Sequence, residues 1–224
     1  MKVSIIIPTY NAQKTIKKAI NSILKQNFSK KDFEIIVVND GSTDKTLEIL
    51  KSYGKQIKII NQKNQRAVKA ANKGFKKAKG KYVIKLDADD YFKSNILKEM
   101  LRIFDNNPGV DFVYCDYFEK STDGKIKKVS TKNILNTLSG GIMFRKSKLV
   151  QESFYREDIK FPEYDLLFKV EKKWYGYHIA KPLFCYNRMK TSLTGDKKWV
   201  KKALTELKRL HPEKIKEIQK IRRY

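Results

Sequence analysis

The feature of this 224-residue chain that most restricts its fold is an alternation of two hydrophobic periods over about its first ninety residues. Continuous apolar runs, typical of strands buried on both faces of a sheet, alternate with stretches of apolar residues at helical spacing. The runs predict strands at Val3–Pro8, Phe33–Val38, Ile57–Ile60 and Tyr82–Leu86, and the stretches predict helices at Ile16–Leu24, Thr43–Tyr53 and Ala67–Ala78. Short connections between such elements imply βαβ units and an α/β fold with a mostly parallel central sheet flanked by helices.

The second half of the chain has a less regular pattern and ends in a strongly basic segment. Helices are predicted at Asn95–Phe104 and Tyr164–Trp174, and strands at Phe112–Phe118, Lys125–Val129, Ile142–Phe144 and Ile179–Tyr186. From Lys197 onward, leucines and isoleucines recur at helical spacing among many lysines. We therefore expect one domain over residues 1–195, followed by a basic helical C-terminal extension over residues 196–224.

Positive charge is the most unusual feature of the composition. The chain has 50 Lys and Arg residues against 24 Asp and Glu residues, a formal net charge of +26. Such a chain attracts polyanions, among them nucleic acid, anionic lipid headgroups and phosphate-bearing substrates. Compositional bias, with the lysines on solvated surfaces, explains the charge equally well, so charge alone does not decide the function.

Cysteine usage and the length of the apolar runs bear on location. Cys115 and Cys185 are far apart and lie in no Cys/His spacing, so neither a disulfide framework nor a zinc site is predicted. No apolar run approaches the roughly 20 residues of a membrane-spanning helix, and the N-terminus enters a strand pattern directly. We expect a cytoplasmic protein, whose C-terminal helices either lie on anionic lipid at the inner face of the membrane or pack on the domain.

Three of the predicted strands end in polar residues. The first runs into Pro8-Thr9-Tyr10-Asn11, the second into Asn39-Asp40-Gly41-Ser42, and the fourth into Asp87-Ala88-Asp89-Asp90. Ligands of parallel sheets bind at the carboxyl ends of the strands, so these residues are expected to face one site. Clustered carboxylates repel one another, and they coexist when a cation or a proton offsets their charge.

Two of these segments suggest specific chemistry. The acidic run from Asp87 to Asp90 suits Mg²⁺ or Mn²⁺, which prefer oxygen ligands and can bridge a protein to a diphosphate; the alternative is an acidic turn that caps the next helix. Asp40, which only accepts hydrogen bonds when ionised, can recognise the ring N–H of uracil or guanine. Its alternative role is an Asx-turn at the entry to a helix.

The segments IIIPTYN, EIIVVNDGSTD and KLDADD, in this order and with these gaps, resemble the family 2 inverting glycosyltransferases of GT-A fold. The resemblance extends over Lys2–Thr194 and includes the stretch from Asn64 to Gly74, FPEYDLLFKV and PLFCYNRMKTSLT. The Asp-x-Asp element alone is weakly specific, whereas the ordered set is strongly specific. The resemblance implies a nucleotide-sugar-binding half over residues 1–92 and an acceptor-binding half over residues 93–195.

The resemblance also implies which residues bind the donor. The segment Pro8–Asn11 would contact the nucleotide, with Tyr10 near the base, and Asp40 would hold the edge of the base. Asp87 would lie by the ribose, with Ala88 beside it. Arg188, in the polar stretch after the last predicted strand, would close over the diphosphate, where an arginine can form bidentate charge-assisted bonds.

Metal-binding and catalytic roles follow from the same resemblance. Asp89, together with Asp90, would hold the Mg²⁺ or Mn²⁺. An acid just before the helix of the second half is the catalytic base in this family, and alignment on FPEYDLLFKV places Glu163 there, with Asp165 as the second candidate. Such a carboxylate would take the proton of the acceptor hydroxyl. Without the resemblance, Glu163 would be interpreted as a first-turn acid favoured by the helix dipole.

The chain departs from the family pattern in the segment that follows the third strand. Arg66 stands in place of a glycine, and Ala71 stands in place of an arginine that contacts phosphate or supports the fold. Arg66 or Lys69 is a candidate to replace the lost contact. Lys190 and Ser192 belong to the same polar stretch as Arg188.

The predicted function is transfer of a sugar from a nucleotide-diphosphate sugar to a hydroxyl of a glycan or lipid-linked acceptor, with inversion and metal assistance, in the synthesis of surface polysaccharide or glycolipid. A UDP-sugar is favoured, and a GDP- or dTDP-sugar is possible. A basic nucleic-acid-binding module is the alternative from another class. It is disfavoured because an acidic cluster occupies the predicted cleft and no RRM, KH or helix-turn-helix pattern occurs. A nucleotidyltransferase and a catalytically impaired glycosyltransferase-like protein are further alternatives.

Overall fold

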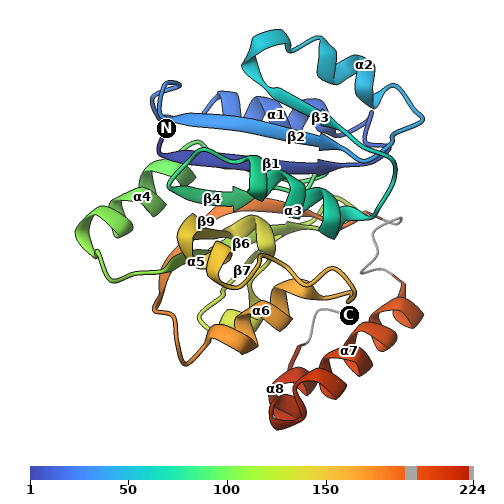
Figure 1. The fold of residues 1–224 in the computed structure, drawn as a ribbon. Helices are drawn as coiled ribbons and strands as arrows, with labels where there is room; N and C mark the ends of the chain where they lie inside the picture. Colours follow the sequence, from blue (N-terminus) through green and yellow to red (C-terminus); the bar gives the residue numbers. More distant parts are fainter. Residues whose placement is uncertain (190–195, 222–224) are drawn as a thin grey trace.

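The computed structural model of the chain describes residues 1–189 and 196–221. Its centre is a sheet in which the strands follow the order β3-β2-β1-β4-β8-β6-β9-β5, with β7 paired to β6. Helices cover both faces of this sheet (Figure 1), as expected for the predicted α/β fold. Within the described residues, no helix is both long enough and apolar enough to cross a membrane.

The first half of the chain forms the predicted series of parallel βαβ units. Its strands are β1 (Val3–Thr9), β2 (Phe33–Asn39), β3 (Lys58–Asn61) and β4 (Tyr82–Lys85), and its helices are α1 (Ile16–Leu24), α2 (Thr46–Lys51) and α3 (Ala67–Lys77). β1 lies between β2 and β4 and runs parallel to both. Every residue of β1 and β2 is buried, which explains their continuous apolar sequence.

The second half extends this sheet with strands of both directions. Its strands are β5 (Tyr91–Phe92), β6 (Phe112–Lys120), β7 (Ile126–Val129), β8 (Ile142–Arg145) and β9 (Gly176–Asn187), and its helices are α4 (Ile96–Asn106), α5 (Lys146–Gln151) and α6 (Pro162–Val170). β8 pairs antiparallel with both β4 and β6, while β9 runs parallel to β6. Helix α6 begins two residues before the predicted start, because Pro162 suits the first helical position.

The two faces of the sheet carry separate hydrophobic cores. Strand side chains alternate between the faces, so Ile5 and Ile7 join the core covered by α1 and α4, whereas Ile6 joins the core covered by α3, α5 and α6. On β4 the same alternation places Ile84 in the first core and Val83 in the second. Lys85, two residues after Val83, therefore shares the face of α3 and α6.

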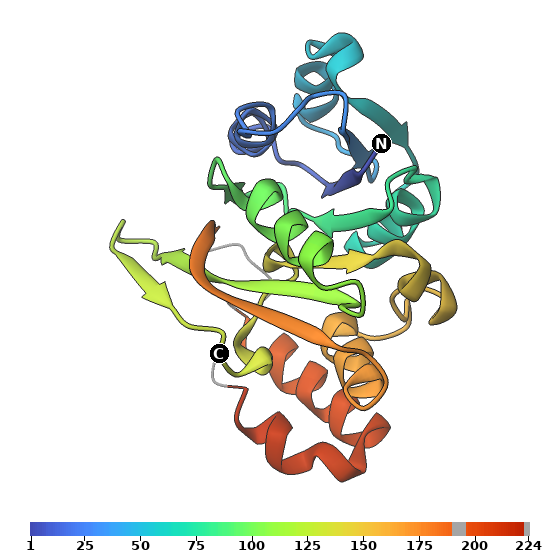
Figure 2. The same ribbon diagram turned by 90° about the vertical axis from the view of Figure 1, so that its left-hand side faces the viewer.

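The basic C-terminal segment forms α7 (Lys197–Leu210) and α8 (Ile215–Gln219), which lie beside α6 in both ribbon views (Figures 1 and 2). A third apolar cluster joins them to the domain. Its buried members are Leu135, Phe161, Tyr164, Phe168, Ala203, Leu207, Ile218 and Ile221. Most of the apolar stripe predicted for these helices is therefore covered by α6, Phe161 and Leu135, whereas Ile215 is 41% exposed.

Candidate active site

The ends of β1, β2 and β4 meet at one edge of the sheet. Thr9 at the end of β1 is in register with Asn39 at the end of β2, and the Asp40 N–H donates to the Thr9 carbonyl at 2.8 Å. On the other side of β1, the Leu86 N–H donates to the Ile6 carbonyl at 2.9 Å. The polar segments that follow these three strands are therefore neighbours, as predicted from their positions after parallel strands.

The segment after β1 is fastened to the loop after β2. Asn11 has a positive φ of 45°, and its side-chain oxygen accepts from the Thr43 N–H at 2.8 Å. The Thr9 hydroxyl is buried and donates to the Ile7 carbonyl, and the Pro8 side chain is also buried. The Tyr10 side chain, by contrast, is 51% exposed, which leaves its ring accessible to a ligand.

Asp40 is buried, and its carboxylate is fixed by the segment that follows β3. Its Oδ1 accepts from the Gln62 side-chain amide at 2.6 Å and from the Gln65 backbone N–H at 2.9 Å. Gly41 allows this approach, because it has a φ of 74° and a Cβ there would lie 2.9 Å from the Asn64 nitrogen. Among the described residues, both hydrogen bonds to the Asp40 carboxylate go to Oδ1, so the other oxygen remains for a ligand.

The acidic run after β4 forms a tight turn closed by the Asp90 N–H, which donates to the Asp87 carbonyl at 3.0 Å. The end of β9 lies against this turn, because the Asn187 N–H donates to the Asp90 carboxylate at 2.9 Å. Burial and the neighbouring carboxylates raise the pKa of Asp90 well above its usual value. Burial, followed by repulsion from Asp87, raises the pKa of Asp89 to about 6.

These residues fit a divalent cation held by few protein ligands. The raised pKa of Asp89 reports an excess of negative charge in a desolvated place, which a bound cation would offset. In the described part of the chain, no group of three His, Cys, Asp or Glu side chains is arranged to hold a metal alone. Mg²⁺ in particular is commonly held by one or two carboxylates together with substrate phosphates, and Asp89 can supply such a ligand. Asp90 fits less well, since its carboxylate already accepts from Asn187.

A buried lysine joins the acidic turn to helix α6. The Lys85 ammonium lies 2.8 Å from an Asp87 carboxylate oxygen and 3.4 Å from a Glu163 carboxylate oxygen. The two carboxylates raise the pKa of Lys85 despite its burial. Glu163 is in the first turn of α6, and its side chain is 26% exposed, so it can reach a bound substrate. The structure thus brings Glu163, from the second half, to the end of β4.

Asp165, the second candidate for the base, is turned away from this group. Residues two apart on a helix point about 200° apart, so Glu163 and Asp165 face opposite directions. The Asp165 carboxylate is buried and lies 2.9 Å from His211 Nε2, at the end of α7. Asp165 therefore joins α6 to the C-terminal helices.

Arg188 follows the end of β9 and is paired with another side chain. Its Nε donates to the Glu119 carboxylate at 3.0 Å, and Lys127 contacts the same carboxylate at 3.1 Å. Although burial opposes the charged form, the contact with Glu119 raises the pKa of Arg188. Lys190 and Ser192, from the same predicted phosphate-binding stretch, lie outside the described residues.

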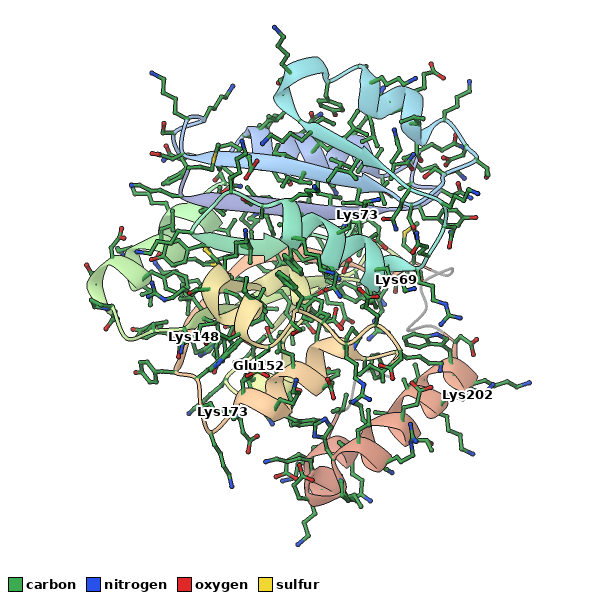
Figure 3. All side chains as sticks on the ribbon, in the orientation of Figure 1. Lys69, Lys73, Lys148, Glu152, Lys173 and Lys202 are labelled. Atoms are coloured by element: carbon green, nitrogen blue, oxygen red, sulfur yellow. The ribbon has the colours of Figure 1, made fainter. Side chains whose placement is uncertain are left out.

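A hollow of about 570 Å³ adjoins the segment that holds Asp40. It is lined by Asn64, Gln65, Arg66, Lys69, Glu157 and Asp158. Arg66 has a φ of 77° at the start of α3, whereas Ala71, farther along that helix, is buried in the core. Lys69 points outward from α3 (Figure 3). Arg66 and Lys69, the two candidates to replace the missing arginine, thus line the same hollow.

Sequence reasoning missed three groups that shape this edge of the sheet. They are Lys85, the Tyr155 hydroxyl, and the amide groups of Gln62 and Gln65 that hold Asp40. Lys85 carried a signal, because it is a charged residue at the end of an otherwise apolar strand. The other two depend on long-range contacts without a local pattern.

Comparisons with known proteins agree with the fold of this structure. The structure is similar to that of *Staphylococcus aureus* TarS residues 1–349 in complex with UDP-GlcNAc, with a TM-score of 0.70, 26% identity, and coverage of 93% of this chain and 67% of that chain. A *Pyrobaculum calidifontis* mannosyltransferase in complex with GDP-Man and Mn²⁺ shares the fold, with a TM-score of 0.74, 15% identity, and coverage of 96% and 64% of the two chains. The fold is therefore that of the GT-A glycosyltransferases.

Sequence comparisons narrow this class to one family. The model of glycosyl transferase family 2 matches residues 4–162, so the chain belongs to this family. The *Bacillus subtilis* uncharacterized glycosyltransferase EpsJ is 39% identical over 124 residues, which are 54% of this chain and 35% of EpsJ. The *S. aureus* poly(ribitol-phosphate) beta-N-acetylglucosaminyltransferase TarS is 37% identical over 111 residues, 48% of this chain and 19% of TarS. The matched region is thus only a part of each relative.

Proposed function

We propose that the chain transfers a sugar from a nucleoside-diphosphate sugar to a hydroxyl of a glycan or lipid-linked acceptor, with inversion, in the synthesis of a cell-surface polysaccharide or glycolipid. Family membership supports the reaction class. TarS, which has been solved with UDP and with UDP-GlcNAc, supports a UDP-sugar as the donor. The reaction would take place in the cytoplasm, at the inner face of a membrane if the acceptor is lipid-linked.

The contact of Lys85 with both Asp87 and Glu163 carries this proposal. Asp87 belongs to the donor-binding half, whereas Glu163 belongs to the acceptor-binding half and is some 75 residues away in sequence. One ammonium group holds their carboxylates at the carboxyl end of β4, where ligands of such sheets bind. A donor held by Asp87 therefore lies within reach of a base at Glu163.

In the proposed donor site, the exposed Tyr10 ring stacks on the base, and the second carboxylate oxygen of Asp40 accepts the ring N–H of uracil. Pro8 and Thr9 place Tyr10 through their burial in β1, and Asn11 does so through its hydrogen bonds with Ser42 and Thr43. Arg188 remains a candidate for the diphosphate, and it would have to leave Glu119 to reach it.

The ribose and metal contacts follow the acidic turn. Asp87 accepts from the ribose hydroxyls, with Ala88 packed against the core beneath it. Asp89 supplies a carboxylate oxygen to Mg²⁺ or Mn²⁺, with Asp90 holding the turn through Asn187. When bound, the ion supplies positive charge to the diphosphate as it leaves.

The chemical step that we assign to a residue of the chain itself is a proton transfer to Glu163. Its carboxylate accepts the proton of the acceptor hydroxyl as that oxygen forms a bond to the anomeric carbon. The bond from this carbon to the diphosphate breaks, and its electron pair leaves with the nucleoside diphosphate. Attack opposite the leaving group inverts the anomeric configuration, so an α-linked donor gives a β-linked product.

Two substitutions separate donor binding from catalysis. Asp89→Ala is expected to abolish the Mn²⁺-dependent part of donor binding, measured by calorimetry with UDP-, GDP- and dTDP-sugars. Glu163→Gln should leave donor affinity within about threefold of wild type and lower turnover by about 100-fold or more, because a general base contributes on this scale. Asp123→Ala, at a carboxylate that is 54% exposed, is the control.

The results that contradict the proposal are equally specific. Unchanged Mn²⁺-dependent binding in Asp89→Ala would show that Asp89 does not hold the metal. Normal turnover in Glu163→Gln would show that Glu163 is not the catalytic base. Affinity for RNA that falls steeply with salt, without binding of any sugar nucleotide, would favour the nucleic-acid-binding alternative.

A further inference from the structure

We infer that Lys85 is a positioning residue of the active site, whose buried ammonium fixes the candidate base Glu163 relative to the donor-binding Asp87. This inference rests on the proposed function, because it assigns a role to a residue that serves the proposed base. It goes beyond the proposed function because it assigns a role to a side chain that acts through Glu163 and need not touch the substrate itself.

The surroundings of Lys85 are unusual for a lysine. It is the last residue of β4, it is 8% exposed, and the rest of that strand is buried. Burying an unpaired ammonium is costly, so a lysine at such a position requires partners of opposite charge. Its partners are the carboxylates of Asp87 and Glu163, at 2.8 and 3.4 Å.

The two carboxylate partners of Lys85 come from different parts of the fold. Asp87 is in the turn after β4, and Glu163 is in the first turn of α6, which packs on the sheet through apolar contacts. Apolar packing fixes the helix but leaves the Glu163 side chain free to choose among rotamers. The ion pair with Lys85 selects the rotamer that faces the acidic turn.

Tyr155 closes this group from the side of α3. Its hydroxyl is buried and has no hydrogen-bond partner among the described residues. Asn72 fixes the backbone of Tyr155 with bonds of 2.7 and 3.1 Å, and the Tyr155 ring packs edge-on against Phe75, with 5.5 Å between ring centroids. Because Lys85 and Tyr155 are both buried, the attraction between Lys85 and the carboxylates is stronger than it would be in water.

The geometry predicts what happens when the ammonium is removed. The carboxylates of Asp87 and Glu163 would then repel each other across the vacated space. Glu163, whose side chain is already 26% exposed, can relieve this repulsion by turning to solvent. A displacement of about 1 Å in a reacting group can lower a rate by about 100-fold, while donor contacts at Tyr10 and Asp40 remain.

The first test measures kinetics in the full chain. Lys85→Met, which keeps the length without the charge, is expected to lower kcat by about 100-fold while donor affinity by calorimetry stays within about fivefold of wild type. Lys85→Arg keeps the charge on a longer, planar group and should lose about tenfold in kcat. Lys76→Met, at an exposed lysine of α3, is the control.

A second test does not depend on activity. A double-mutant cycle of Lys85→Met and Glu163→Gln in urea unfolding should give a coupling of about tenfold in the unfolding equilibrium constant. If Lys85→Met does not fold, both measurements use Lys85→Gln, which also removes the charge. A kcat within about threefold of wild type in the folded variant that lacks the charge, or a coupling near unity, would overturn the inference. A wild-type chain that binds no sugar nucleotide, yet shows the coupling, would overturn only the proposed function.

Discussion

Substitution of Asp165 tests whether the two acids of α6 have separate tasks. The Asp165 carboxylate and the His211 imidazole form a buried contact of 2.9 Å, with side-chain exposures of 5% and 10%. Asp165→Ala removes the acceptor and leaves His211 Nε2 buried without its partner. We expect this change to reduce stability and to leave the chemistry of Glu163 intact.

The expected loss follows from the burial of both groups. Leaving a buried polar group unpaired costs about 1–3 kcal/mol, and breaking a buried pair of charges costs about 3–5 kcal/mol. For Asp165→Ala we expect a loss of about 2–4 kcal/mol, and for Asp165→Asn, which keeps an acceptor oxygen, about 1 kcal/mol. In a domain of this size each kcal/mol lowers the melting temperature by roughly 2–4 °C, so Asp165→Ala should melt about 5–15 °C lower.

The assay combines thermal unfolding with turnover at a temperature at which all variants are folded. Asp165→Asn should retain kcat within about threefold of wild type, whereas Glu163→Gln should lose about 100-fold and melt only about 3–5 °C below wild type, as its tenfold coupling to Lys85 implies. The opposite pattern, with normal stability and lost turnover in Asp165→Asn, would refute the assignment and make Asp165 the base.

Two further predictions concern the fold. A Cβ on Gly80 would lie 2.6 Å from the Ser4 backbone nitrogen. Gly80→Ala should therefore lower the free energy of unfolding by about 1–3 kcal/mol, as measured by urea titration. Gly109→Ala, where a Cβ would have nothing within 4 Å, is the control and should have little effect. Burial raises the pKa of Glu34, but hydrogen bonds from Lys58 and Ser4 outweigh this effect and hold the pKa below its usual value. This stabilisation is present above about pH 4.5 and is lost as the pH falls toward the folded-state pKa, so the stability of wild type should fall more steeply on acidification than that of Glu34→Gln; equal slopes would contradict it.

The parallel half of the fold was predictable because its signals are local. The apolar runs of β1 and β2 reflect burial on both faces of the sheet, and their ends define the edge at which Tyr10, Asp40 and Asp87 lie. The insertion of β8 between β4 and β6 was not predictable, because antiparallel pairing over four residues leaves no distinctive period. The candidate site followed the same division: the polar residues that follow β1, β2 and β4 were predicted, whereas the role of Lys85 was not, because its partner Glu163 comes from the second half of the chain.

The roles of the individual acidic residues depend on contacts with residues that lie outside the sequence motifs. Asp90 belongs to the same acidic run as Asp89, yet Asn187, nearly a hundred residues away, donates its backbone N–H to the Asp90 carboxylate and reaches only the backbone carbonyl of Asp89 with its side chain. Asp165 lies two residues from Glu163, but helical geometry turns it toward His211. Helical periodicity alone would have separated the two candidates for the base, because positions i and i+2 do not share a face.

The amphipathic pattern of the C-terminal helices predicts an apolar face but does not predict which surface covers it. Periodicity establishes that α7 has an apolar face, but a lipid surface and a protein surface select the same pattern. In the structure Ala203 and Leu207 are buried against α6, so these side chains are not available for insertion into a bilayer. The exposed residues of α7 are polar and mostly charged, including Lys202, which points away from the domain (Figure 3). Any attraction of α7 to an anionic surface must therefore be mainly electrostatic, and it should weaken as salt shortens the range of the charges.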